Sequence, residues 1–346
     1  MTENVSEKKG RESGPDLIRT IACFFVVGAH FYLNMDYYQE PMAGTKMFIM
    51  TTLRWLFVTA VPLFFMLTGY FKKNKKADRN HYMAAVPLIF SYVAVSVMKM
   101  LLYNRIYGKI YSFGDMLKNL GNYQIAWYMG LYLCVFLLIP FLNKGWYALS
   151  EKEQNILIAT LVFLCTVYPV LKYIAPAYFT GIYPVLFYFL GIAVRDRRWR
   201  ANRLVLAAVL FVTLLAEGFI SMKFTSTGVF DWNLISVSDG TYGTFFISVC
   251  TVCIFLLLYD VKIGSKIISR ILASVSAVSF EIYLFAGAYD AIIYQYVKKH
   301  VQGAVNAFWW FFITVPASFL CAYISSIIFT RIRDLILRIP GRFSRS

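Results

Sequence analysis

Ten apolar stretches follow one another along most of this sequence, and they constrain its fold more than any other feature. A membrane-spanning helix needs about 20 predominantly apolar residues. The sequence therefore predicts an all-α polytopic membrane protein of about ten transmembrane helices, at residues 15–34, 46–71, 81–103, 123–143, 155–172, 181–195, 203–223, 240–262, 272–297 and 305–333. We expect one transmembrane domain over 15–333, between an N-terminal tail, 1–14, and a basic C-terminal tail, 334–346.

The distribution of basic residues predicts the orientation of these helices. The net charge is +16, which by itself would suggest a nucleic-acid partner. However, 23 Lys and Arg residues fall in the tails and alternate loops that share one side of the predicted topology, and 8 fall in the loops of the other side. Basic loops stay cytoplasmic. We therefore expect both termini in the cytoplasm, no nucleic-acid partner, and the lipid bilayer of a cell membrane as the surroundings.

The cysteines favour neither a disulfide framework nor a metal site. All six fall inside predicted helices, and the only close pair is "CTVC" at 250–253. That pair lies in an apolar helix without further ligand residues. We interpret these thiols as buried apolar side chains and predict no metal site.

A few ionisable residues interrupt the apolar stretches. In the first stretch, Arg19 lies near the predicted inner interface and His30 follows eleven residues later. Eleven residues are close to three helical turns, so both side chains share a face and are separated by roughly 16 Å. Arg54 and Glu217 are predicted at depths similar to that of His30, and Glu281 lies near mid-membrane. Because charge in lipid is costly, such residues face a bundle interior or a polar cavity.

Each of these residues also has an interpretation without chemistry. Arg19 is also suited to anchoring a helix at the interface, His30 to a hydrogen bond between helices, and Arg54 to a buried ion pair with a glutamate. Together, however, they would supply a base, a carboxylate that orients it and a cationic clamp. We expect Glu217, rather than Glu281, to orient His30, because its predicted depth is closer.

The same residues resemble the acyltransferase-3 family of membrane proteins. The first helix of that family has an Asp, an Arg three residues later and a His eleven residues after the Arg, which here are Asp16, Arg19 and His30. "VPLFFMLTGYF", 61–71, is similar to its second-helix signature, with Thr68 in place of Ser. Weaker similarities occur at 127–142, at 186–196 and in "VSFEIYLF", 278–285, so that the resemblance covers about 14–333.

One departure from the family pattern limits what carries over. Many members have a Gly and a later His in the segment around 278–286, where this chain has Glu281 and Ala286. A mechanism that depends on this second His therefore does not apply to this chain.

The resemblance implies a function. Members move an acyl group, usually acetyl, from cytoplasmic acyl-CoA to a hydroxyl of a cell-envelope glycan or lipid-linked sugar, so acetyl-CoA would be a substrate and no permanently bound cofactor is expected. His30 would act as the general base, with Glu217 or Glu281 as its carboxylate. The residues expected to bind the donor are cationic: Arg19, Arg54, Lys72, Lys73 and Arg79.

Other functions remain open at this point. The basic loops at 72–81 and 195–203 suit nucleotide phosphates, but positive-inside topology alone also explains them. A transporter or flippase for a glycan or small polar solute is the leading alternative, although the sequence has no internal repeat of the kind many transporters show. A sensor or ligand-gated membrane protein is another alternative, and the expected absence of a soluble domain favours it. An unrelated membrane-bound O-acyltransferase fits less well, because the sequence has no late Asn/His pair.

Overall fold

The computed structural model is all-α, as the sequence predicts, and it describes residues 11–166, 177–231 and 241–337. No β-strand occurs within these ranges. The α-helices are α1 (Ser13–Asn34), α2 (Thr45–Val58), α3 (Ala60–Lys72), α4 (Arg79–Met83), α5 (Val86–Tyr107), α6 (Phe113–Gly121), α7 (Trp127–Ala148), α8 (Glu151–Thr166), α10 (Tyr183–Arg197), α11 (Arg203–Lys223), α13 (Phe245–Leu258), α14 (Lys266–Ala277), α15 (Ser279–Lys298) and α16 (Phe311–Ile336). The 3₁₀ segments are Tyr37–Gln39, Ala177–Ile182, Thr241–Gly243 and Phe308–Trp310.

Each predicted stretch contains an α-helix among the described residues, but the helices differ in length. Among the described residues, six helices or helix pairs are long and apolar enough to cross a membrane: α1, α2 with α3, α4 with α5, α7, α11, and α16 with its preceding 3₁₀ turn. The α14–α15 pair qualifies as a seventh only if its two helices, bent by 74°, form one span. The α13 helix has 14 residues and is shorter. The count of ten crossings and the placement of both termini therefore stay predictions.

Parts of the sequence-based expectations lie outside the described residues. These are positions 1–10 of the N-terminal tail, 167–172 of the fifth predicted stretch, position 240 and positions 338–346 of the C-terminal tail.

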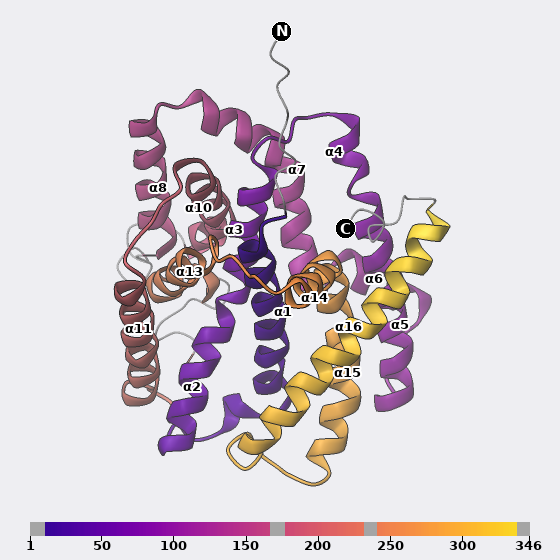
Figure 1. Cartoon of the computed structure of the whole chain (residues 1–346). Helices are drawn as coiled ribbons and strands as arrows, with labels where there is room; N and C mark the ends of the chain where they lie inside the picture. The colour runs from indigo at the N-terminus through magenta and orange to yellow at the C-terminus, as the bar shows by residue number, and fades with distance from the viewer. Residues whose placement is uncertain (1–10, 167–176, 232–240, 338–346) are drawn as a thin grey trace.

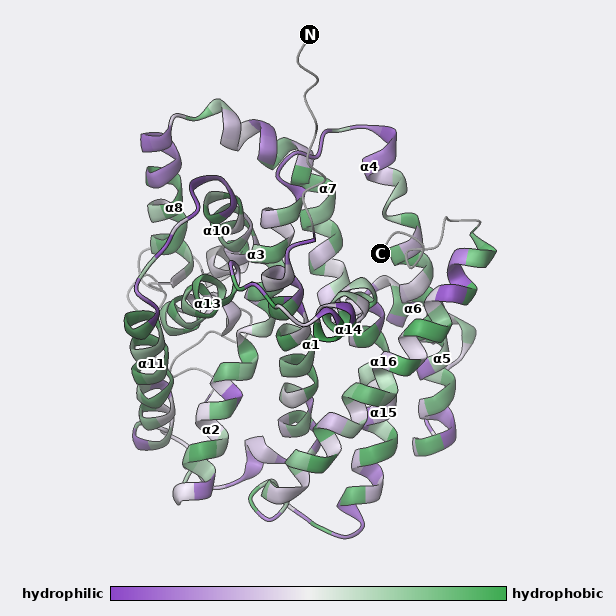
Figure 2. Ribbon diagram, in the orientation of Figure 1, coloured by the Kyte–Doolittle hydropathy of each residue, from purple (hydrophilic) through white to green (hydrophobic). Residues whose placement is uncertain are grey.

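The hydropathy of the helices matches their placement in a membrane. Figure 2 shows hydrophobic residues along most of helices such as α11 and α13, and hydrophilic residues gathered around α4. Local sequence signals set where helices start: Asn202 caps α11 by accepting from the backbone nitrogen of Leu204 at 2.8 Å, and Pro184 lies in the first turn of α10. A side-chain oxygen at the N-cap satisfies an otherwise unpaired amide, and proline fits a first turn.

The α1 helix lies in the middle of the bundle (Figure 1). It contacts α2, α3, α13, α14, α15 and α16. Beside it, α3 packs closely on α10, because Gly69 and Gly191 let the two backbones approach: a Cβ added at Gly69 would overlap the carbonyl oxygen of Tyr188, and one at Gly191 that of Met66. Small residues permit this kind of contact between membrane helices. The α3 helix also contacts α1, and the candidate site lies beside these two helices.

Candidate active site

A cavity of about 540 Å³ lies along one side of α1, and we call it the main cavity. Residues of α1, α3, α7, α14 and α15 line it, among them Arg19, His30, Thr68, Tyr132, Ser276 and Tyr283. Two breaks in helices occur at its wall. The α14–α15 bend lies between Ala277 and Ser279, and the α2–α3 junction lies between Val58 and Ala60, and all four residues line the cavity. Irregular backbone at membrane depth is tolerated where it lines a cavity.

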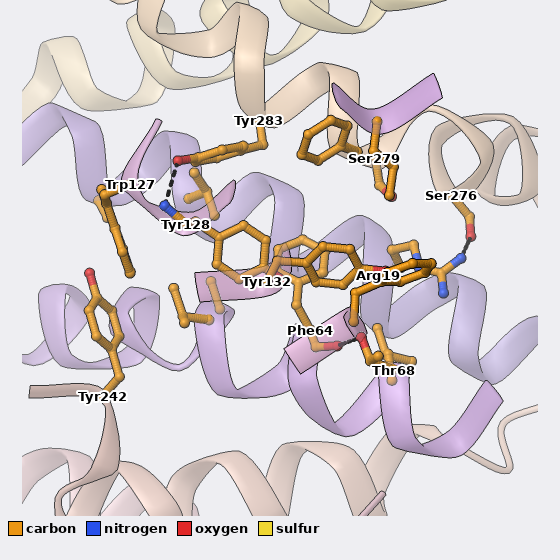
Figure 3. A pocket seen from close by; sticks show the side chains of 18 of the residues that line it. Arg19, Phe64, Thr68, Trp127, Tyr128, Tyr132, Tyr242, Ser276, Ser279 and Tyr283 are labelled. Atoms are coloured by element: carbon orange, nitrogen blue, oxygen red, sulfur yellow. Dashed lines mark hydrogen bonds between the residues drawn. The ribbon is translucent and has the colours of Figure 1, made fainter. Parts of the chain in front are cut away.

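The two ends of the main cavity differ in chemistry. Figure 3 shows Arg19 and Ser276 at one end and Trp127 and Tyr242 at the other. Arg19 donates to the Ser276 hydroxyl at 2.8 Å. At the far end, the rings of Trp127 and Tyr242 stack with their centroids 5.2 Å apart. The cavity therefore leads from a cationic end to an aromatic end.

His30 reaches the main cavity from α1, and its side chain is 21% exposed. Its Nδ1 lies 2.5 Å from Oδ2 of Asp290, which α15 supplies and which is buried. The other oxygen of Asp290 accepts a hydrogen bond of 2.7 Å from the hydroxyl of Ser318, a fully buried residue of α16. Three helices thus form one chain of side chains, from Ser318 through Asp290 to His30.

This geometry is suited to general-base chemistry. A carboxylate that holds one ring nitrogen of a histidine fixes the tautomer and the ring orientation. With Nδ1 directed at Asp290, Nε2 is the nitrogen available to take a proton from a substrate. The arrangement can therefore activate a hydroxyl group inside the main cavity.

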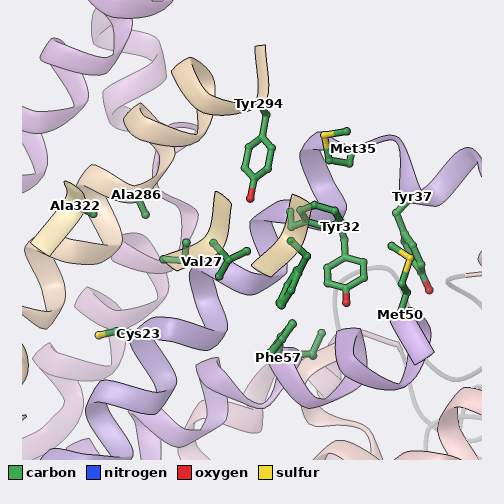
Figure 4. Close-up of a cluster of buried hydrophobic side chains, with 14 of the residues drawn as sticks. Cys23, Val27, Tyr32, Met35, Tyr37, Met50, Phe57, Ala286, Tyr294 and Ala322 are labelled. Atoms are coloured by element: carbon green, nitrogen blue, oxygen red, sulfur yellow. The ribbon is translucent and has the colours of Figure 1, made fainter. Parts of the chain in front are cut away.

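The part of the α1 surface that does not line the main cavity is packed into the apolar core and holds the helix in place (Figure 4). Cys23, Val27 and Tyr32 are buried there, in one cluster with Ala286 and Tyr294 of α15. Because apolar burial on this side is extensive, the rotation of α1 is fixed. Arg19 and His30 are consequently both presented to the main cavity, as their spacing predicts.

The expectation that Glu217 orients His30 is wrong in this structure. Glu217 is fully buried on α11, lines neither cavity described here, and its oxygens form no hydrogen bond with any described residue. Glu281 is also elsewhere: its carboxylate pairs with Arg333, and the Ser91 hydroxyl donates to it at 3.3 Å. Depth along the membrane normal was a poor guide, because it does not tell which helices are neighbours.

The five cations expected at the donor site separate into two groups. Arg19 and Lys72 line the main cavity. Arg54 does not line it; its guanidinium is buried 4.2 Å from the ring centroid of Phe230 and 4.4 Å from that of Trp55. Lys73 pairs with Asp196, and Arg79 is exposed at the start of α4 and lines neither cavity.

A second cavity, of about 560 Å³, adjoins the cationic end, and we call it the mouth cavity. It shares three residues with the main cavity: Arg11, Arg19 and Lys72. Glu12, also in its wall, accepts from the Tyr70 hydroxyl at 3.0 Å and pairs with Arg195. Partial burial raises the pKa of Glu12, but the hydrogen bonds from Arg195 and Tyr70 outweigh this and hold its pKa below the usual value.

Several residues of the site escaped prediction from the sequence. Asp290 had a clear signal, because it is a carboxylate inside the apolar stretch 272–297, the same feature that drew attention to Glu281. Lys75 and Arg195 belong to basic loops that the sequence associated with phosphate, but nothing in the sequence singles them out of those loops. Trp127 begins the segment 127–142 that resembles the family, but neither it nor Tyr242 stands out as a site residue in a chain with 18% aromatic residues.

Comparison with known proteins agrees with the resemblance found in the sequence. The acyltransferase-3 family model, described as an acyltransferase domain, matches residues 12–327. The match includes α1 to α15 and most of α16. Neither a curated protein nor a solved structure shows a significant match to the chain.

Proposed function

This chain belongs to the acyltransferase-3 family, and from that membership we propose that it is an O-acyltransferase of a cell membrane, that of a bacterium. It moves an acetyl or short acyl group from cytoplasmic acyl-CoA to a hydroxyl of a cell-envelope glycan or lipid-linked sugar. Membership in an acyltransferase family favours this function over a transporter or flippase. Acyl-CoA is then a substrate that binds and leaves, and no resident cofactor takes part.

The observation that carries the proposal is the His30–Asp290 pair beside a cavity with a cationic end. The acyl donor enters from that end, with Arg19 and Lys72 near its charged groups, and its thioester reaches His30. The acceptor ring occupies the end formed by Trp127 and Tyr242, because aromatic faces pack well on apolar faces of a ligand while polar tips stay available.

The reaction follows from this placement. Nε2 of His30 takes the proton of the acceptor hydroxyl as its oxygen attacks the thioester carbonyl carbon. The C–S bond then breaks, and the sulfur of CoA leaves as a thiolate and receives the proton from His30. An ester and a free thiol result, and His30 returns to its starting state. Asp290 stabilises the imidazolium that exists between the two proton transfers.

The test is acyl transfer by purified protein in lipid nanodiscs, measured as free thiol released from acetyl-CoA in the presence of a membrane glycan fraction. We expect His30→Ala to lower the rate by about 10²–10⁴-fold, the usual effect of losing a general base. His300→Ala is the matched control, because His300 is an exposed histidine that lines neither cavity. A His30→Ala variant with the wild-type rate would contradict the proposal.

A further inference from the structure

The mouth cavity carries more positive than negative side chains. Its lining includes five basic residues, Arg11, Arg19, Lys72, Lys75 and Arg195, and two acidic ones, Glu12 and Asp16. Each acidic residue has its own partner, since Asp16 pairs with Arg11 at 2.5 Å and Glu12 pairs with Arg195. With five basic and two acidic side chains, the lining has a net positive charge, which attracts an anion into the cavity.

Lys72 is the last residue of α3, and Lys75 follows in the loop directly after it. The backbone at both positions is held from inside the bundle. Asn143 of α7 donates from Nδ2 to the carbonyl oxygens of both Lys72 and Lys75, each at 2.9 Å. Asn143 is only 4% exposed. Its own amide oxygen accepts a hydrogen bond of 2.6 Å from the hydroxyl of Tyr188 on α10.

These hydrogen bonds fix the backbone positions of Lys72 and Lys75, and so fix where the two side chains begin. A lysine on a free loop loses much conformational entropy when it binds an anion. Holding the loop in advance reduces this cost and raises affinity. Because one buried amide holds both carbonyl groups, the placement of both lysines depends on Asn143.

We propose that the mouth cavity binds the phosphate groups of the acyl donor and that Asn143 is a positioning residue for this site. The proposal rests on the proposed function, because it takes acyl-CoA as the donor. Phosphate suits Lys and Arg side chains, which form charge-assisted hydrogen bonds to its oxygens. The adjoining main cavity then receives the part of the donor that carries no phosphate and leads the thioester towards His30.

The experiment compares donors with and without phosphate groups. In isothermal titration, wild-type protein in nanodiscs should bind coenzyme A more tightly than pantetheine, which lacks the nucleotide. Asn143→Leu and Lys75→Gln should each weaken coenzyme A binding about tenfold, the effect of one lost charge-assisted contact, and leave pantetheine binding unchanged. Where turnover is measured, KM for acetyl-CoA should rise while KM for S-acetylpantetheine and both kcat values stay constant.

Two matched variants control for general damage. Lys76→Gln removes a neighbouring exposed lysine that lines neither cavity, and Asn119→Leu removes an asparagine that also donates to a backbone carbonyl, that of Asp115, but lies far along the chain on α6. Both should bind coenzyme A as the wild type does. If Asn143→Leu does not fold, Lys75→Gln still tests the phosphate site, because Lys75 is exposed.

The outcomes separate the two proposals. Equal wild-type affinity for coenzyme A and pantetheine would overturn the phosphate site, whether or not acyl transfer is found. An unchanged preference for coenzyme A in Asn143→Leu would overturn the positioning role. A preference for coenzyme A that depends on Lys75 and Asn143, in a protein without acyl transfer, would instead contradict the proposed function alone.

Discussion

At the scale of single residues, the site depends on contacts between helices that are far apart in the sequence. His30, Asp290 and Ser318 come from α1, α15 and α16 and are joined by hydrogen bonds of 2.5 and 2.7 Å. The sequence predicted the shared face of Arg19 and His30, because their spacing is a property of one helix. It could not predict which carboxylate faces His30, because that depends on how helices pack against one another.

The Asp290 contact leads to a prediction about rate. We expect Asp290→Asn to lower acyl transfer by about 10²–10⁴-fold, because an amide no longer stabilises the imidazolium and can hold the wrong tautomer. Glu217→Gln should keep a rate close to wild type, since Glu217 does not contact His30. The transfer rates of the two variants, each purified at the same yield, decide whether Asp290 or Glu217 acts with His30. A loss of rate confined to Glu217→Gln would return the orienting role to the seventh predicted stretch.

At the scale of helices, the sequence predicted where helices occur but not where they break. All ten apolar stretches contain helix in the described residues, because about 20 apolar residues in lipid have to satisfy their backbone groups internally. The 74° bend between α14 and α15 falls at Val278, and neither Pro nor Gly occurs within eight residues of it on either side. Such a break is set by the packing around it, so the sequence alone gives no sign of it.

The close contact between α3 and α10 can be tested through stability. We expect Gly69→Ala to lower the free energy of unfolding by roughly 1–3 kcal/mol, because the new methyl group would overlap the carbonyl oxygen of Tyr188. Gly145→Ala is the control, since a Cβ there meets no atom within 4 Å. Thermal melting of both variants in the same detergent measures the difference. Equal melting of Gly69→Ala and wild type would show that the two helices separate without cost.

At the scale of the whole molecule, the length of the apolar stretches predicted the fold class. It did not predict which helices pack against one another. The central position of α1 depends on which faces of six neighbours fit it, and hydropathy carries no such information. The orientation in the membrane depends on charge outside the bundle, which the sequence does carry, as the 23 to 8 division of Lys and Arg shows.

That orientation is open to direct labelling. We expect Lys76→Cys to react with a membrane-impermeant thiol reagent only after cells are opened, because the positive-inside rule predicts that the loop after α3 is cytoplasmic. Lys109→Cys, between α5 and α6, should react on intact cells. Both variants are made in a chain whose six native cysteines are replaced. The reverse labelling pattern would show that the orientation is inverted and that the mouth cavity lies on the outer face.

Arg19 and His30 lie on one uninterrupted helix, so α1 itself sets the distance between them. The distance between the two side chains is set by the number of residues between them, and a single inserted residue would turn one about 100° away from the other. Loops elsewhere tolerate insertions far better. Length variation among related chains should therefore collect in the connecting loops, while the interval of eleven residues in α1 stays constant even where most of its apolar side chains are exchanged.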